Sequence, residues 1–314
     1  MNNLKAHVNK PLINNADVDI LMESLKDLGY RFTRPLEERS SYLTEPTNNK
    51  MLRAVILDTE TTGTDYIQDK IIELGMVAFD YCPYTGMIGD VHGTFNQLEY
   101  PGFPIPPEST KVHHITDDMV EGKHINDDEV EAFIASASII IAHNSKFDRR
   151  FVEPRFPIFK TKPWACSFAQ IDWSAEGLGS SKLEFLAYRS GFHYEGHRAS
   201  TDCHALLEVL HCAPTESGIL PMKQMLDNAR LKEYKVSALN APFESKDLLK
   251  SRGYRWNAER KVWHTFIQES EFDAEAEWLK SEVYNNKKCK IEREKVDAFN
   301  RFSDRVGAID VADF

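Results

Sequence analysis

AVILDTETTG (54–63) is an apolar run that changes abruptly into carboxylates and hydroxyls. An uninterrupted apolar run is typical of a strand buried on both faces of a sheet. Asp58 and Glu60 follow it two residues apart, and such residues point the same way on an extended segment. Two neighbouring carboxylates repel each other unless a cation lies between them, and oxygen ligands favour Mg²⁺ or Mn²⁺. A strand that ends in solvated acids would give the same pattern, so these residues alone do not decide the function.

A second stretch, IIIAHNSKFDRRF (139–151), places one acid on a helix that follows another buried strand. Phe147 and Phe151 are four residues apart, so they face the core together and thereby fix the direction of Asp148. An exposed acid on an amphipathic helix is the alternative interpretation. This stretch alone therefore leaves the role of Asp148 open.

A third stretch, GHRASTDCHALL (196–207), combines a histidine and an acid at the start of a helix. His197 lies in a loop next to a glycine, and Asp202 follows five residues later in the opening turn. The helix dipole favours an acid at this place for structural reasons alone, and a loop histidine is commonly a polar surface group. The functional interpretation therefore rests on the combination of the three stretches.

Taken together and in this order, the stretches resemble the DnaQ-like 3′–5′ exonuclease family with an Asp-Glu-Asp-Asp-His site. The family's motifs are matched by DTETTG (58–63), by HNSKFD (143–148) and by the histidine with an aspartate five residues on. A further signature, His-Ile-Thr, occurs in VHHITDDMV (112–120), although His114 stands where the family usually has glycine. The resemblance covers residues 53–211, about half of the chain, and is strongest to the exonuclease X branch.

The resemblance implies an α/β, ribonuclease H-like fold with a mixed central sheet flanked by helices. It also implies two divalent cations, Mg²⁺ or Mn²⁺, one held by Asp58, Glu60 and Asp202, the other by Asp58 and, through water, Asp148. His197 is implied as the general base, and 5′-mononucleotides as the products. Five further residues are implied as contacts to the terminal nucleotide or the substrate strand: Thr61, Thr62, His113, His114 and Asn144.

The resemblance leaves the substrate and the biological setting open. DNA, either single-stranded or at 3′ ends, is the expected nucleic acid, and no polymerase contact is indicated. The alternatives are a 3′–5′ exoribonuclease of the ribonuclease T type, because the 2′-hydroxyl is sensed by pocket shape, and a polymerase-associated proofreading subunit. A catalytically inactive nucleic-acid-binding protein on the same fold is a further alternative. It would be expected to lack a metal ligand, whereas all five site positions are filled.

The bulk composition agrees with a folded, metal-dependent enzyme. The chain has 314 residues, a net charge of −11 and a pI near 5.5. This charge disfavours a protein that simply coats nucleic acid, but a carboxylate site attracts phosphate once metals are bound. Five irregularly spaced cysteines without a Cys-x-x-Cys pair favour reduced thiols over disulfides or zinc. The absence of a membrane-length apolar run and of a signal-like N-terminus predicts a cytoplasmic protein without membrane contact.

The hydrophobic pattern divides the chain into four parts: an N-terminal helical appendage and linker (1–50), the exonuclease domain (51–213), a small α+β accessory module (222–283) and a charged C-terminal tail (284–314). In the exonuclease domain we expect strands at 53–57, 71–79, 89–98, 138–142 and 164–168, and helices at 126–137, from 145, at 181–189 and at 200–211. Prolines between 101 and 107 predict an extended loop.

The accessory module contains a basic, aromatic segment, KDLLKSRGYRWNAERKVWH (246–264). Cations next to exposed aromatic rings are typical of single-strand binding, where rings stack on bases. Arg255, Trp256 and Trp263 are therefore possible accessory contacts to nucleic acid. The alternative is a small domain whose aromatic residues, Tyr254 among them, form its own core.

Overall fold

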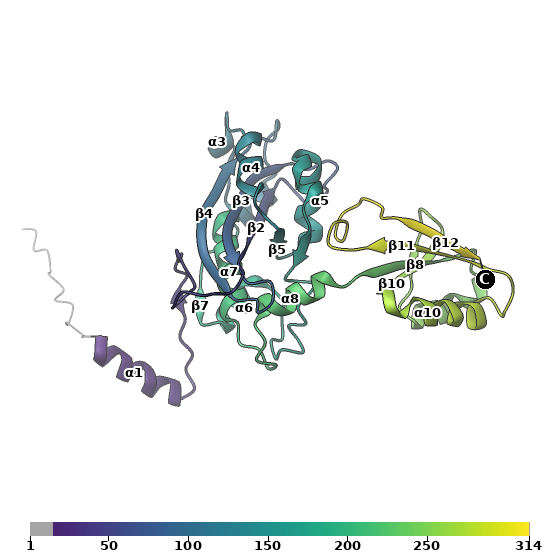
Figure 1. Ribbon diagram of the computed structural model, residues 1–314. Coiled ribbons are helices and arrows are strands. Elements are labelled where there is room, and N and C mark those ends of the chain that lie inside the picture. Colours follow the sequence, from purple (N-terminus) through teal and green to yellow (C-terminus); the bar gives the residue numbers. More distant parts are fainter. Residues whose placement is uncertain (1–14, 314) are drawn as a thin grey trace, which may run out of the picture.

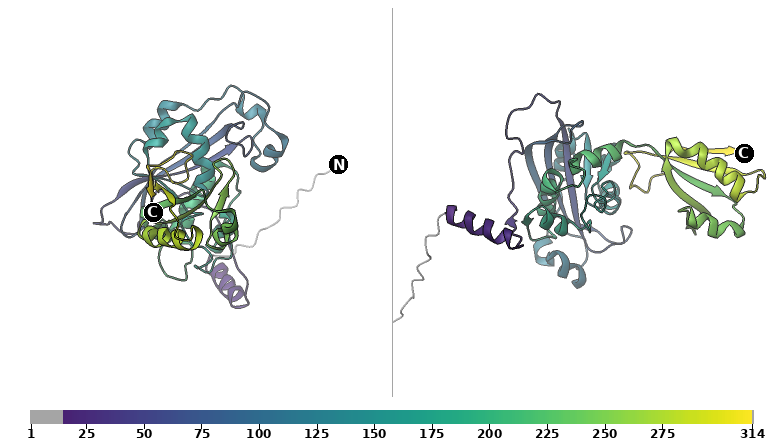
Figure 2. Two further views of the ribbon diagram at one scale, coloured as in Figure 1. Left: turned by 90° about the vertical axis from the view of Figure 1, so that its right-hand side faces the viewer. Right: turned by 90° about the horizontal axis from the view of Figure 1, so that it is seen from below.

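The protein, seen in a computed structural model that describes residues 15–313, is built around two five-stranded sheets (Figure 1). The larger sheet and its helices lie in the middle of the chain, and the smaller sheet follows at the C-terminal end. Helix α1 (Asn15–Asp27) stands apart from both, as the two further views confirm (Figure 2). Within residues 15–313 we find no helix with the length and apolar character needed to cross a membrane.

The larger sheet has the strand order β4-β3-β2-β5-β6 and is mixed. β2 runs antiparallel to β3 and parallel to β5, and β5 is parallel to β6. The strands are β2 (Leu52–Thr61), β3 (Ile71–Tyr81), β4 (Ile88–Leu98), β5 (Ile139–Ala142) and β6 (Trp164–Cys166). Each of the five expected strands is present, and β2 extends four residues beyond the expected 53–57, so Asp58 and Glu60 lie within it.

Helices cover both faces of this sheet because the central strand is apolar on both sides. In β2, Ala54 and Ile56 face one core and Val55 and Leu57 face the other, and all four are fully buried. The first core is closed by α6 (Leu183–Arg189), α7 (Ala199–Cys212) and α8 (Pro221–Arg230), the second by α4 (Asp127–Ile134) and α5 (Ser145–Arg155). The predicted fold class, a mixed sheet flanked by helices, is confirmed.

Three short helical segments were not predicted from the sequence, and the first begins at the end of the proline-rich stretch. Residues 101–106 belong to no helix or strand, but Pro107 begins α2 (Pro107–His113), since proline fits the first turn of a helix. The short α3 (Asp117–Val120) follows. A 3₁₀ turn, Pro157–Thr161, lies between α5 and β6. The expectation of a loop up to Pro107 was therefore wrong at its end.

The predicted linker 34–50 packs along the larger domain. β1 (Arg34–Pro35) pairs in parallel with β7 (Phe192–His193), and Tyr42 is buried in the first core. Arg34 and Arg39 both bond to the carboxylate of Glu208, whose side chain is fully buried in α7. Residues 1–14 of the predicted appendage lie outside the described residues.

The smaller sheet has the order β12-β11-β8-β10-β9 and is antiparallel throughout. Its strands are β8 (Glu233–Leu239), β9 (Arg255–Asn257), β10 (Val262–Gln268), β11 (Lys290–Val296) and β12 (Ile309–Asp313). α9 (Lys246–Ser251) and α10 (Phe272–Trp278), with short helical turns at Phe243–Ser245, Glu269–Glu271 and Leu279–Val283, complete it. From β8 to β11 the succession strand–helix–strand–strand–helix–strand is the split β-α-β arrangement.

The boundaries of the C-terminal parts differ from the expected ones. Residues 284–314, predicted as a charged tail, supply β11 and β12, and β11 pairs with the central β8. The charges concealed these strands, because Glu292 and Glu294 are buried. Glu292 pairs with Arg260 of the turn between β9 and β10, and Glu294 pairs with Lys235 of the neighbouring β8. α8 falls largely within the predicted module, yet its apolar residues pack into the core of the larger domain.

Gly75 permits a close approach between the larger sheet and α7. This residue of β3 pairs with Asp58 of β2. A Cβ atom at position 75 would lie 2.3 Å from the carbonyl carbon of Ala199, the first residue of α7. We predict that Gly75→Ala lowers the free energy of unfolding by about 1–3 kcal/mol, the usual effect of overpacking. Chemical denaturation measures this change. Gly179→Ala is the control, because a Cβ there meets no described atom within 4 Å; equal losses in both variants would contradict the interpretation.

Candidate active site

Three carboxylates from two elements converge at the end of the central strand. Asp58 and Glu60 project from β2, and Asp202 from the first turn of α7. Each offers one oxygen atom, and these atoms lie within 4.8 Å of one another. The structure thus brings together residues that are more than 140 positions apart in the sequence.

Asp148 is joined to the same strand by hydrogen bonds. It is buried in α5, and its Oδ1 accepts from the backbone N–H of Thr59 at 3.1 Å and from its Oγ1 at 2.8 Å. Thr59 lies between Asp58 and Glu60, so α5 is fastened to β2 between the two predicted metal ligands. Asp148 therefore lies beside the three-carboxylate group without belonging to it.

All four carboxylates have raised pKa values. Burial, together with the charges of Asp148, Asp202 and Glu60, raises the pKa of Asp58 well above its ordinary value. Burial also raises the pKa of Glu60 to about 8 and that of Asp148 to about 7. For Asp202, burial raises the pKa although a hydrogen bond from Tyr194 opposes the shift.

Divalent cations would relieve this accumulation of negative charge. Within residues 15–313 no lysine or arginine side chain forms a salt bridge with any of the four carboxylates; Arg198, nearby, is paired with Glu73. Three convergent carboxylates with an unpaired charge match the oxygen ligand sets of Mg²⁺ and Mn²⁺. The residues present therefore fit the predicted kind of metal.

His197 lies at the exposed rim of the group, in the loop before α7. Its backbone has φ 65°, in the left-handed region where histidine is enriched among non-glycine residues. Half of its side chain is exposed, and its Nε2 lies 3.9 Å from Oε1 of Glu184. Its charge also lowers the pKa of Asp202. The imidazole is thus solvent-accessible and within electrostatic reach of the carboxylates.

The two predicted substrate-binding threonines use their hydroxyls within the protein. Thr61 Oγ1 donates to the carbonyl of Gly63 at 2.6 Å. Thr62 Oγ1 donates to Asp69 and accepts from the backbone N–H of Lys70, both at 3.0 Å. These bonds hold the loop after β2 in place. The backbone groups of Thr62 are bonded as well, its N–H to the carbonyl of Lys70 at 2.9 Å and its carbonyl to Ser109 Oγ at 2.7 Å.

The other predicted contacts lie at the ends of α2 and α5. His113 is buried, and its Nδ1 accepts from the backbone N–H of Ile115 at 3.0 Å, while its Nε2 is buried with no partner in the described part of the chain. His114 ends α2 in a left-handed conformation with φ 59°. Asn144 is exposed just before α5 and lines a cavity of about 190 Å³ with Tyr66 and Arg150.

Three residues of the site's support were not predicted. Glu73 is fully buried opposite Glu60 and accepts from the guanidinium of Arg198 at 2.8 Å and from the backbone N–H of Ala199. Tyr194 donates its hydroxyl to Asp202 at 3.0 Å, and the backbone N–H of Arg198 donates to the same carboxylate at 3.0 Å. A glutamate within an otherwise apolar strand, at 71–74, is the one local signal that could have indicated Glu73.

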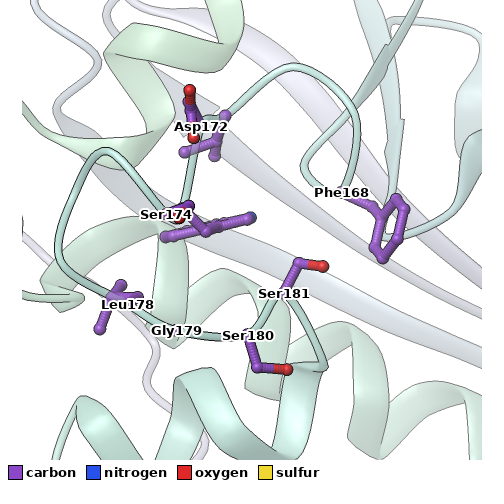
Figure 3. Close-up of a pocket in the computed structure, with 9 residues that line it drawn as sticks. Phe168, Asp172, Ser174, Leu178, Gly179, Ser180 and Ser181 are labelled. Carbon is purple, nitrogen blue, oxygen red and sulfur yellow. The ribbon is translucent and has the colours of Figure 1, made fainter.

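A cavity of about 290 Å³ lies away from the carboxylates, in the loop between β6 and α6 (Figure 3). Phe168 and Ser181 face each other across it. His143, from the second motif, supports this loop, since its ring nitrogens bond to Ser167 Oγ at 2.8 Å and to the carbonyl of Ser181 at 2.7 Å. None of the five predicted catalytic residues lines this cavity.

Comparisons with known proteins identify relatives of this chain. The family described as Exonuclease matches residues 55–210. DNA polymerase III subunit epsilon of Treponema pallidum is 32% identical over 161 residues, which are 48% of this chain and 72% of that protein. Exodeoxyribonuclease 10 of Escherichia coli K12 is 30% identical over 167 residues, 51% of this chain and 67% of that protein. A structure of exonuclease X in complex with 5′-overhanging duplex DNA has 25% identity and a TM-score of 0.40, covering 56% of this chain and 98% of that one.

The raised pKa values of the carboxylates predict how stability depends on pH without metal. The pKa values of folded Glu60 (about 8) and Asp148 (about 7) exceed the ordinary 4.5 and 3.8. Between these limits the folded state holds protons that the unfolded state has released, so stability falls as pH rises. We therefore expect the Tm in EDTA to fall from about pH 5 to about pH 8, and Mg²⁺ or Mn²⁺ to raise it more at the higher pH.

The matched variant is Asp58→Asn, which removes one of the repelling charges. Its Tm in EDTA should depend less on pH than that of the unmodified protein. Thermal unfolding followed by circular dichroism at several pH values tests both expectations. A Tm that is constant or rises over this pH range in EDTA would contradict them.

Proposed function

Because the chain belongs to the DnaQ-like 3′–5′ exonuclease family, we propose that it removes nucleotides from the 3′ ends of DNA and releases 5′-mononucleotides. The observation that carries this proposal is the convergence of Asp58, Glu60 and Asp202 within 4.8 Å. DNA is proposed over RNA because one relative is named an exodeoxyribonuclease and the relative solved as exonuclease X holds duplex DNA.

The carboxylates would hold two divalent cations, Mg²⁺ or Mn²⁺. Asp58, Glu60 and Asp202 would bind one, and Asp58 with Asp148, the latter through water, the second. When bound, such ions stabilise the negative charge that develops on the phosphate during its hydrolysis. The hydrogen bonds from Tyr194 and from the backbone N–H of Arg198 would orient Asp202 toward its ion.

His197 would act as the general base that takes a proton from the attacking water. Its exposed position at the rim gives the imidazole access to solvent, to which the proton can pass afterwards. Glu184, 3.9 Å from Nε2, would stabilise the imidazolium, weakly because both side chains are half exposed. No described side chain other than Glu184 forms an ion pair with His197.

Contacts to the terminal nucleotide would come from the loop after β2 and the ends of α2 and α5. The unpartnered Nε2 of buried His113 supports a polar contact to the substrate, because a buried nitrogen left without a bond is unfavourable. Thr61 and Thr62, with His114 and Asn144, would complete the pocket. Recognition would then rest on sugar and phosphate more than on base identity.

The C-terminal sheet would add contacts to the nucleic acid farther from the site. Arg255 and Trp256 are exposed, and Trp256 packs against Trp263 with ring centroids 5.4 Å apart. Tyr254, by contrast, is buried and donates its hydroxyl to Glu275 at 3.0 Å, so it belongs to the core of this part. Arg255 and Trp256 remain the proposed accessory contacts, with Trp263 as the support of the exposed ring.

A second candidate is a proofreading subunit that works with a polymerase. The similarity to a protein named DNA polymerase III subunit epsilon favours it. A ribonuclease T-type activity on RNA is the other alternative. An assay on DNA and RNA ends distinguishes activity on DNA from activity on RNA. Co-purification with a DNA polymerase would favour the proofreading role.

Asp58→Asn should abolish hydrolysis while leaving the fold intact. We expect the unmodified protein, with Mg²⁺ or Mn²⁺, to shorten end-labelled single- or double-stranded DNA stepwise from its 3′ end, and RNA more slowly. Loss of metal assistance worth several kcal/mol should lower kcat on the order of 10³-fold. Product ladders on denaturing gels measure both substrate choice and rate.

The control is Asp90→Asn, the same substitution at an exposed position of β4. It should leave the rate unchanged. Full activity of the Asp58 variant would remove the proposed site, and an unmodified protein inert on every polynucleotide end would remove the proposed function.

His197→Ala should lower kcat by about 10²-fold or more, the usual contribution of a general base. Its effect on KM should be small, because the imidazole is not expected to hold the substrate. The acidic limb of the pH–rate profile should also change, since the titrating base is lost. A profile that matches that of the unmodified protein would refute the assignment.

A further inference from the structure

A segment of the C-terminal sheet holds the helix that carries Asp148. Residues 297–305, in the loop between β11 and β12, reach back to α5 and are called the clamp segment below (Figure 1). The segment is more than 140 residues from α5 in the sequence. It thus connects the second sheet directly to the candidate site.

Arg149 is the centre of this contact. It follows Asp148 directly, and successive residues on a helix point about 100° apart. Its side chain is fully buried, and its guanidinium donates to the carbonyls of Arg301 at 2.7 Å and Phe299 at 2.6 Å. A longer bond of 3.4 Å reaches the carbonyl of Ala298. The backbone of the clamp segment therefore supplies most of the acceptors of this buried charge.

The larger domain supplies only part of the hydrogen-bond acceptors and packing partners of the Arg149 guanidinium. Its Nε donates to Glu153 at 2.7 Å, and its guanidinium lies 5.2 Å from the ring centre of Trp164. Glu153 itself accepts from Ser303 and Arg305 of the clamp segment, at 2.5 and 3.1 Å. Since a buried charge without its hydrogen bonds is strongly unfavourable, α5 cannot keep this arrangement when the segment is displaced.

The clamp segment is anchored independently on the far side. Arg301 is buried and donates to the carbonyls of Ala229 at 3.0 Å and Leu231 at 2.5 Å, at the end of α8. It also pairs with Glu233 at 2.9 Å. The backbone N–H of Trp164 in β6 donates to Ala298 at 2.7 Å. The segment is thus fixed to α8 and β6, which gives α5 a rigid partner.

A second arginine of α5 extends the contact to the rim of the site. Arg150 pairs with Asp304 at 2.5 Å and lies over the ring of Tyr66, 4.5 Å from its centre. Tyr66 belongs to the loop that follows β2, and both residues line the cavity next to Asn144. The same segment therefore supports one wall of the expected substrate path.

We infer that the clamp segment completes the active site, with Arg149 as a positioning residue that fixes α5 and thereby aims Asp148 at the metal group. This inference rests on the proposed role of Asp148. A misplacement of about 1 Å in a catalytic group can lower a rate by about 10²-fold. Residues that orient metal ligands typically contribute about 10–100-fold to metal affinity or activity.

The experiment compares Arg149→Met and Arg301→Gln in the 314-residue chain with the unmodified protein. Binding of Mn²⁺ is measured by electron paramagnetic resonance of the free ion, without substrate, and kcat and KM are measured on DNA. We expect Mn²⁺ affinity to fall by about 10-fold and kcat by about 10–100-fold. KM should change little. Arg149→Lys, which keeps the charge but reaches fewer carbonyls, should restore part of the affinity.

Arg293→Gln is the matched control. Arg293 lies in β11 of the same sheet and pairs with Asp310 at 2.6 Å, and the structure records no bond from it to the larger domain. Mn²⁺ binding and kcat should stay at the level of the unmodified protein. If Mn²⁺ affinity and kcat fell in Arg293→Gln as well, the cause would be a general weakening of the C-terminal sheet. This result would overturn the specific role of the clamp segment.

If Arg149→Met does not fold, a further variant tests whether the clamp segment supports Mn²⁺ binding and kcat. In this variant glycine and serine replace residues 298–304. It keeps β11 and β12 and removes the anchoring side chains. Native Mn²⁺ affinity and kcat in this variant or in folded Arg301→Gln would overturn the inference. An unmodified protein that binds Mn²⁺ but leaves every DNA end intact would instead defeat the proposed function, while the Mn²⁺ measurements would still test the clamp.

Discussion

The larger domain must hold together carboxylates that repel each other at one end of its central strand. Asp58, Glu60 and Asp202 converge there, and Asp148 lies beside them. Groups that repel each other stay together only on a scaffold that cannot relax. A sheet buried on both faces provides this scaffold, because moving its central strand would disturb two cores at once.

Hydrogen bonds fasten the two helices that carry acids, α5 and α7, to β2 and to its neighbour β3. Thr59 binds Asp148 and so fixes α5. The buried Glu73 binds the side chain of Arg198 and the first amide of α7, and the missing side chain of Gly75 lets that helix lie directly on β3. The acids are thus held in place by hydrogen bonds and packing within the larger domain.

Local patterns were enough to predict the fold class, the five strands of the larger sheet and the helices that bear the acids. Neighbouring residues fix the directions of Asp58 and Asp148 within one strand or one helix, but only the resemblance of the three combined stretches to a known family assigned the two acids to one site. The role of Glu73 could not be predicted, since it depends on Arg198, more than 120 residues away. The strands within 284–314 were missed for the same reason, because their buried glutamates are paired with cations at least 30 residues away, Arg260 and Lys235.

The hydrogen bond between the amide of Trp164 and the carbonyl of Ala298 has a consequence for association between molecules. β6 is the last strand on its side of the larger sheet, and an uncovered last strand offers its backbone groups to strands of other chains. The returning C-terminal loop occupies part of this edge with a segment of the same chain. Displacing this loop would therefore expose unpaired backbone groups of β6. Self-association of the enzyme should then increase as the contacts of the loop are lost.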